Sequence, residues 1–165
     1  MKTLGILFIG IVIISACFGQ QSALGNDAQD CYETGLRYYN SKDYSGALKW
    51  WSKAANQGHT EAQGQLGFMY YEGQGVPQSY EEALKWFRKA ADKEDTDAQR
   101  LLGVMYYQGQ GVTQDYVEAL KWFRKAADKG ESIAQRLLGF MYREGQGVLF
   151  FTFYGQKRGD FLIIY

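Results

Sequence analysis

The residue types that carry most enzyme chemistry are scarce in this chain of 165 residues. It contains one histidine, His59, and two cysteines, Cys17 and Cys31. Two thiols exclude a disulfide framework and a four-thiolate zinc site. His59 has no carboxylate or cysteine companion that repeats with it, so we interpret it as a solvated turn residue rather than a catalytic base. We therefore expect no metal and no cofactor.

The remaining motifs do not indicate catalysis either. The Gly-x-Gly sequences at 73–75 and 109–111 lack the third glycine and the preceding strand of a dinucleotide site, and the Lys-Ser/Thr pair of a P-loop. The chain has no Ser-x-x-Lys or Gly-x-Ser-x-Gly motif, so covalent acyl transfer has no nucleophile in its usual context. The sequence therefore favours a protein that is not an enzyme.

Composition narrows the class of protein further. The 18 lysines and arginines balance the 18 aspartates and glutamates, whereas nucleic-acid binding requires a clustered basic surface. A charged fraction of 22% and an aromatic fraction of 16% are typical of a folded chain rather than a disordered one. We expect one folded domain and no nucleic-acid partner.

Residues 1–16 have the pattern of a secretory signal. Lys2 precedes an apolar run over residues 4–14, which spans ~17 Å as a helix and is too short to cross a bilayer. The sequence Ile14-Ser15-Ala16-Cys17 resembles the bacterial lipobox, which implies cleavage before Cys17 and lipidation of that cysteine. Phe18 after the cysteine implies an outer-membrane lipoprotein facing the periplasm.

The alternative to lipidation is ordinary cleavage after Gly19, which would give a secreted or soluble periplasmic protein. Residues 17–27 are polar and read as a tether. In either case we expect the protein to be exported, with a lipid anchor as its only contact with a membrane.

A 36-residue period dominates the rest of the chain. Residues 60–95 and 96–131 are identical at 26 of 36 positions without a gap, and a third copy begins over residues 132–148. Self-similarity with a period of 20–50 residues is typical of a solenoid.

Each unit is predicted to contain two helices. Ala62, Leu66, Met69 and Tyr70 have the spacing of one helical stripe, and the spacing repeats from Ala83 to Ala91. Capping boxes are predicted at the start of the first helices, and polar N-caps at the start of the second helices. The predicted boxes pair Thr60 with Gln63, Thr96 with Gln99 and Ser132 with Gln135, and the predicted second-helix caps are Asp43, Ser79 and Asp115.

Glycines recur inside the predicted first helices, at Gly67, Gly103 and Gly139. Glycine destabilises a helix interior, so its recurrence at one phase predicts close approach of a neighbouring helix. We expect aromatic residues of the second helices, Phe87 and Phe123 among them, to fill the space.

Together these residues resemble a known family. The pattern Ala-x-x-x-Leu-Gly-x-Met-Tyr-x-x-Gly-x-Gly-Val, then Tyr-x-x-Ala-Leu-x-Trp-Phe-x-x-Ala-Ala, is similar to the Sel1-like repeat (SLR), a branch of the tetratricopeptide repeat (TPR) superfamily. It covers 60–95 (SLR 1), 96–131 (SLR 2) and 132–148 (partial SLR 3). Residues 28–59 lack the Gly-x-Gly-Val loop and are closer to a standard TPR. The resemblance implies an all-α, right-handed α-solenoid that acts as a protein-binding scaffold.

The resemblance also implies where a partner binds. In the TPR fold, first-helix positions that point away from the core line a concave groove. Here these positions differ between the copies, and several are tyrosine or arginine, which dominate binding hot spots; the alternative is that they are ordinary solvated helix positions. The candidate partner-binding residues are Phe68, Tyr71, Glu72, Arg100, Tyr107, Arg136 and Arg143. The outer, solvated face is expected to carry Lys49, Lys85, Arg88, Lys121 and Arg124.

Residues 149–165 depart from the repeat. Two apolar, β-prone runs flank a turn-like linker where a second helix should follow, a pattern that favours a hairpin or aggregation. A frameshifted or truncated gene also explains this tail.

Three functions remain open from the sequence. The one favoured is an exported scaffold that binds a protein or peptide at the cell envelope, without catalysis. The alternatives are an envelope hydrolase acting on cell-wall or β-lactam compounds, and a truncated remnant of a longer SLR protein.

Overall fold

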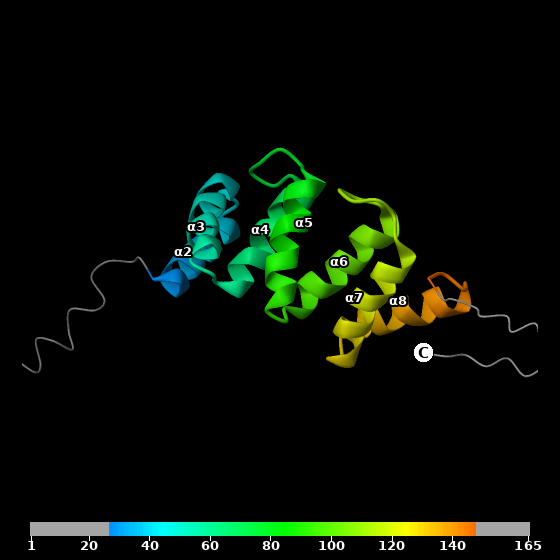
Figure 1. The fold of residues 1–165 in the computed structure, drawn as a ribbon. Helices are drawn as coiled ribbons and strands as arrows, with labels where there is room; N and C mark the ends of the chain where they lie inside the picture. Colours follow the sequence, from blue (N-terminus) through cyan, green and yellow to red (C-terminus); the bar gives the residue numbers. More distant parts are fainter. Residues whose placement is uncertain (1–26, 148–165) are drawn as a thin grey trace, which may run out of the picture.

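The computed structural model describes residues 27–147. The predicted signal, the lipidation site Cys17, most of the tether and the apolar tail lie outside the described residues. The described part contains seven α-helices and no strand, which confirms the all-α helical-repeat prediction (Figure 1). The helices are α2 (Ala28–Asn40), α3 (Tyr44–Asn56), α4 (Thr60–Glu72), α5 (Tyr80–Asp92), α6 (Thr96–Gln108), α7 (Tyr116–Asp128) and α8 (Ser132–Arg143).

The helices pack in the order in which they follow one another along the chain. Contacts are most extensive within the pairs α2–α3, α4–α5 and α6–α7, and each pair also packs against the first helix of the next. Figure 1 shows the result, an extended row of pairs with α2 at one end and α8 at the other. A chain in which each unit touches mainly its neighbours is a solenoid.

Each complete helix pair is closed by an aromatic ring that packs on a glycine of the first helix. A Cβ atom added at Gly67 would lie 2.7 Å from Phe87 Cδ1, and one at Gly103 would lie 2.6 Å from Phe123 Cδ1. Both phenylalanines are 1% exposed. The predicted close approach is thus confirmed for these two glycines, since any side chain there would displace the ring.

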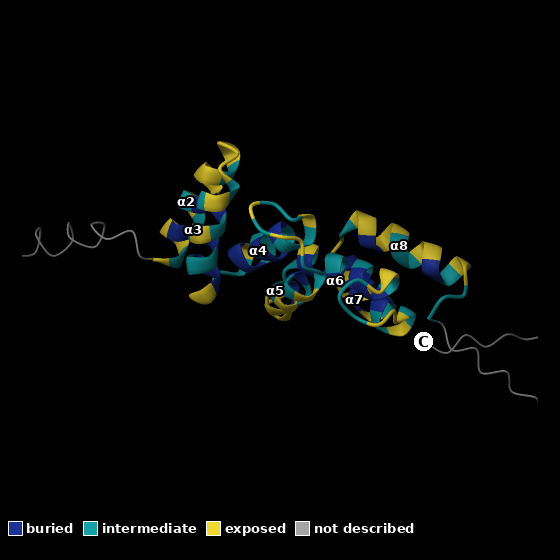
Figure 2. Ribbon diagram, turned by 90° about the horizontal axis from the view of Figure 1, so that it is seen from above, coloured by how far each residue is buried: buried dark blue, intermediate teal, exposed yellow. Residues whose placement is uncertain are grey.

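Gly139 occupies the corresponding position of α8, but its surroundings differ from those of Gly67 and Gly103. No heavy atom of the described residues lies within 4 Å of the position of an added Cβ, because α8 has no following helix in the described part of the chain. Exposed residues accordingly recur along the length of α8 in Figure 2.

The Gly-x-Gly loops join the two helices of one repeat and pack on the second helix of the preceding repeat. Gly73 ends α4 in the left-handed conformation (φ +72°), and Gly75 (φ +69°) brings the loop against the start of α3, where an added Cβ would lie 2.7 Å from the backbone of Tyr44. Gly111 packs in the same way on the backbone of Tyr80. These glycines are needed for a left-handed turn and a close backbone approach.

The N-caps of the second helices agree with the sequence prediction. In each of the three, a polar side chain accepts a hydrogen bond from a backbone N–H of the first turn. The pairs are Asp43 with Gly46, Ser79 with Glu82, and Asp115 with both Val117 and Glu118.

The predicted capping boxes of the first helices were wrong by one residue. Thr60, Thr96 and Ser132 are already helical, so the cap is the residue before each. The caps are His59, Asp95 and Glu131, which accept from the N–H of Ala62, Ala98 and Ala134.

The glutamines of the predicted boxes have another role. Gln63 and Gln99 are buried, and their side-chain amides donate to the carbonyl oxygens of Ala55 and Ala91, at 3.0 and 3.2 Å. Gln135 donates likewise to Ala127, at 3.2 Å. These carbonyls also accept from the backbone N–H groups of Gly58, Glu94 and Gly130. Each glutamine thus adds a second hydrogen bond to a carbonyl at the end of the preceding helix.

Alanine substitutions should have opposite effects at Gly67, which the Phe87 ring covers, and at Gly139, which no side chain in residues 27–147 covers. Gly67→Ala is expected to lower the free energy of unfolding by about 1–3 kcal/mol, because its Cβ overlaps the Phe87 ring. Gly139→Ala is expected to raise it by about 0.5–1 kcal/mol, because alanine favours the helix and meets no neighbour. Urea denaturation of both variants measures the difference, and equal effects would contradict the packing described here.

Candidate partner-binding groove

The first helices present one row of residues that are exposed or half-buried. Its half-buried members, Phe68 and Tyr71 among them, also pack against the core. In α4 the buried residues include Ala62, Leu66 and Met69, whereas Glu61 and Glu72 are exposed. The same phase recurs in α6 and α8. We call this row the first-helix stripe. Its members are Glu61, Gly64, Phe68, Tyr71, Glu72, Asp97, Arg100, Val104, Tyr107, Gln108, Ile133, Arg136, Phe140, Arg143 and Glu144.

The predicted site residues differ in their exposure to solvent and in the contacts they make. Glu72, Arg136 and Arg143 are exposed, while Phe68 and Tyr107 are half-buried. Arg143 lies over the Phe140 ring, 5.3 Å from its centroid, and pairs with Glu144 at 3.2 Å.

Tyr71 is half-buried and contributes to packing. Its hydroxyl donates to Gln110 Oε1 of the next repeat at 2.9 Å, and its ring lies 5.4 Å from that of Tyr80. Burial, with a contribution from Tyr80, raises the pKa of the Tyr71 phenol. Tyr39 makes the corresponding bond to Gln74 at 3.1 Å. This tyrosine therefore ties one repeat to the next.

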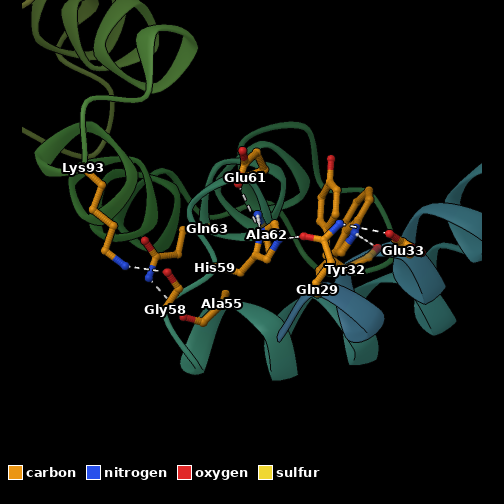
Figure 3. Close-up of polar contacts among 11 residues, drawn as sticks. Gln29, Tyr32, Glu33, Ala55, Gly58, His59, Glu61, Ala62, Gln63 and Lys93 are labelled. Atoms are coloured by element: carbon orange, nitrogen blue, oxygen red, sulfur yellow. Dashed lines mark hydrogen bonds and ion pairs between the residues drawn. The ribbon is translucent and has the colours of Figure 1, made fainter. Parts of the chain in front are cut away.

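Each first-helix N-cap lies beside a residue of the preceding first helix. We call these three places the repeat junctions. At the first junction, shown in Figure 3, the Tyr32 ring stacks on His59 with centroids 4.6 Å apart and planes at 18°. His59 Nδ1 accepts from the Ala62 N–H at 3.3 Å, so Nε2 carries the proton and donates to Gln29 Oε1 at 2.8 Å.

This arrangement corrects the sequence interpretation of His59 as a solvated turn residue. Its side chain is 11% exposed, because the ring is enclosed by the stack and by the cap. The imidazole has a structural role at the start of α4, and both nitrogens are engaged.

At the third junction, an ion pair takes the place of the aromatic stack. The Arg100 guanidinium lies 3.3 Å from Asp97 Oδ1 and 3.9 Å from Glu131 Oε2, and its side chain is 20% exposed. Arg100, one of the predicted site residues, is therefore held between two carboxylates of its own chain.

The second junction has a carboxylate and a glycine. Asp95 Oδ1 accepts from the Ala98 N–H at 2.7 Å, and the facing residue of the preceding helix is Gly64. Burial raises the pKa of Asp95, and the carboxylates of Asp97 and Glu61 raise it further, against the opposite effect of the Ala98 N–H.

Sequence reasoning placed Arg100 among the candidate partner-binding residues but missed the N-cap residues that face the first helices. The available signal was the period itself, since Asp95 and Glu131 are 36 residues apart and carry like charge. The stack of Tyr32 on His59 crosses the irregular first unit and left no such signal.

Residues 27–147 contain neither a metal-ligand cluster nor a membrane-spanning helix. No group of three or more histidine, cysteine, aspartate or glutamate side chains in this range is placed to hold a metal ion. Nor does any helix in it combine the length and hydrophobicity that crossing a membrane requires.

Replacing the second-junction cap should reveal the raised pKa. The folded state binds the Asp95 proton more tightly than the unfolded chain does. The contribution of Asp95 to the free energy of unfolding therefore falls as pH rises from about 4 through the folded-state pKa of Asp95. Asp95→Asn keeps the cap oxygen without a charge. Its stability advantage over the wild type is therefore expected to grow as pH rises to 7, measured by urea unfolding across this range.

The matched control is Asp95→Ala, which removes the cap oxygen as well as the charge. It is expected to be about 1 kcal/mol less stable than Asp95→Asn at every pH. If the difference in free energy of unfolding between the wild type and Asp95→Asn does not change with pH, the pKa of Asp95 is not raised in the folded state.

Comparison with known proteins agrees with this geometry. The family model described as Sel1 repeat matches residues 21–59, 60–95, 96–131 and 132–149. The comparison with curated proteins found no significant match.

Solved structures show the same fold. A protective antigen of uropathogenic Escherichia coli strains, displaying an SLR fold, is 43% identical with a TM-score of 0.74, over 78% of this chain and 28% of that one. A Sel1 repeat protein from Oxalobacter formigenes is 35% identical with a TM-score of 0.70, over 74% of this chain and 50% of that one.

A more distant structure supports the fold alone. Cysteine-rich protein B of Helicobacter pylori is 22% identical with a TM-score of 0.54, over 71% of this chain and 98% of that one. The matched part of the present chain thus spans about half or less of the first two structures and nearly all of the third. With four family matches and this geometry, the chain belongs to the Sel1-repeat family.

Proposed function

We propose that this protein is an exported scaffold that binds a protein or peptide partner along the first-helix stripe, without catalysis. Sel1 repeats are a scaffold fold typical of protein–protein interaction. The observation that carries the proposal is the contrast between core and stripe. The core is nearly identical in the two full copies, whereas stripe positions 64, 68 and 72 change from Gly, Phe and Glu to Arg, Val and Gln.

The side chains on the last part of the stripe are of the kind that binds proteins. Ile133 and Phe140 of α8 are 40% and 39% exposed, and the exposed Arg136 and Arg143 lie on the same helix. Exposed apolar side chains beside arginines are typical of protein-binding surfaces.

Export is proposed from the N-terminal sequence. The apolar run at 4–14 and the lipobox-like Ile14-Ser15-Ala16-Cys17 favour a periplasm-facing outer-membrane lipoprotein. The balanced net charge argues against a nucleic-acid partner.

Crosslinking and pull-down from envelope fractions tests the scaffold. The variant Glu72→Ala/Arg136→Ala/Arg143→Ala removes three exposed stripe side chains and should leave the fold intact, checked by circular dichroism. The recovered partner is expected to fall about tenfold or more, because hot-spot side chains dominate binding.

The matched control for this pull-down lies on the second helices. Glu81→Ala/Lys85→Ala/Lys121→Ala also removes three exposed side chains and changes the net charge by the same amount. The control should recover the partner as well as the wild type does. Equal recovery by the stripe variant would overturn the site.

Substitution of Cys17 tests the anchor. Cys17→Ala is expected to abolish incorporation of radiolabelled palmitate and to move the protein from the membrane to the soluble fraction, because no lipid can be attached. Unchanged fractionation would contradict the lipid anchor, and would leave cleavage after Gly19 to be tested by N-terminal sequencing.

A further inference from the structure

The second repeat junction lacks the side-chain partner that the other two possess. At the first junction the Tyr32 ring covers His59, and at the third the Arg100 guanidinium lies beside Glu131. At the second, Gly64 faces Asp95, and Asp95 Oδ2 would lie 3.7 Å from an added Cβ. The carboxylate at this junction therefore has no side chain across from it on α4.

At the third junction, an arginine side chain occupies the position that is open beside Gly64. There the guanidinium of Arg100 lies between the carboxylates of Asp97 and Glu131. The residues 36 positions earlier are Glu61, Gly64 and Asp95. Both carboxylates are thus present at the second junction, and only the arginine is replaced.

Neither packing nor backbone conformation requires glycine at position 64. Gly64 lies in the middle of α4 with no positive φ, and its added Cβ would make only an ordinary contact with Asp95. Gly67, one turn away, is by contrast covered by the Phe87 ring. Gly64 therefore destabilises the helix interior and leaves the space beside Asp95 unfilled.

The surrounding charge is negative. Asp95 is half-buried, and the carboxylates of Glu61 and Asp97 both raise its pKa. Glu61 and Asp95 also raise the pKa of the nearby Tyr32 phenol, after the larger effect of burial.

The imidazole that lies beside Glu61 does not neutralise its carboxylate. His59 Nδ1 lies 3.3 Å from Glu61 Oε2, but in the neutral ring this nitrogen accepts from Ala62 and has no proton to offer. The carboxylates of Asp95 and Glu61 therefore lie near an open position over Gly64, and together they attract a cation.

We propose that the second repeat junction is a subsite for an arginine side chain of the partner. The guanidinium enters over Gly64 and pairs with Asp95 and Glu61, as Arg100 pairs with Glu131 and Asp97. The planar group suits this place better than an ammonium, because it presents donors to two carboxylates at once. This inference rests on the proposed scaffold function and specifies the chemistry of the partner.

Nuclear magnetic resonance of the 15N-labelled full-length chain in a non-ionic detergent tests the subsite. The probe is N-acetyl-arginine methylamide, and the matched control is N-acetyl-citrulline methylamide, which has nearly the same shape without the charge. The arginine probe should shift the amide resonances of Gly64, Asp95 and Glu61, with an affinity about tenfold higher than that of the citrulline probe. Equal affinities, or no shift at these residues, would overturn the proposal.

Variants at position 64 give a second readout. Gly64→Arg rebuilds the ion pair of the third junction within the chain, so it should raise the unfolding midpoint by a few degrees and abolish the response to the arginine probe. Gly64→Ala should raise the midpoint through helix propensity alone and retain probe binding. If Gly64→Arg still binds the probe, the assigned place is wrong.

The outcome is separable from that of the scaffold proposal. A partner that is captured equally by wild type and Gly64→Arg would leave the scaffold standing and overturn the arginine subsite. A probe that binds at Gly64 and Asp95, in a chain that captures no partner, would support the subsite and count against the scaffold.

Discussion

The packing of one aromatic ring on one helix-interior glycine is the constraint from which the rest of the structure follows. Phe87 on Gly67 and Phe123 on Gly103 fix how closely the two helices of a repeat approach. Because the ring occupies that side of the first helix, the side chains at Glu61 and Glu72 are left on a different side, exposed to solvent. The stripe is therefore a consequence of how each pair closes.

The repeat junctions show how one backbone arrangement carries different chemistry. All three place an N-cap beside the preceding first helix, yet one holds an aromatic stack, one an ion pair and one a bare carboxylate. The cap bond to the backbone is retained in each case. Variation is thus confined to side chains that the core does not need, which lets a repeat protein change its binding surface without changing its fold.

Much of the fold was predictable because it depends on local pattern. The period, the two helices of each unit, the second-helix caps and the glycine contacts of Gly67 and Gly103 all follow from residue types at fixed spacing. The first-helix caps were misplaced because threonine followed by glutamine three residues later matches a capping box. In the structure, Gln63 instead donates to Ala55 of the preceding helix, a tertiary contact that the local pattern does not contain.

The contacts that sequence reasoning missed cross from one repeat to the next. The bond from Tyr71 to Gln110 spans 39 residues, and the stack of Tyr32 on His59 crosses the shorter first unit. Both depend on how repeats are stacked, which the spacing within a unit does not specify. Export, the lipid at Cys17 and the role of residues 149–165 remain predictions from the sequence.

Hydrogen–deuterium exchange of the full-length chain, with and without its captured partner, tests the central claim that the partner lies along the first-helix stripe. Binding is expected to slow exchange in α4, α6 and α8 and to leave α5 and α7 unchanged. Slower exchange confined to α5 and α7 would place the partner on the outer face and contradict the account.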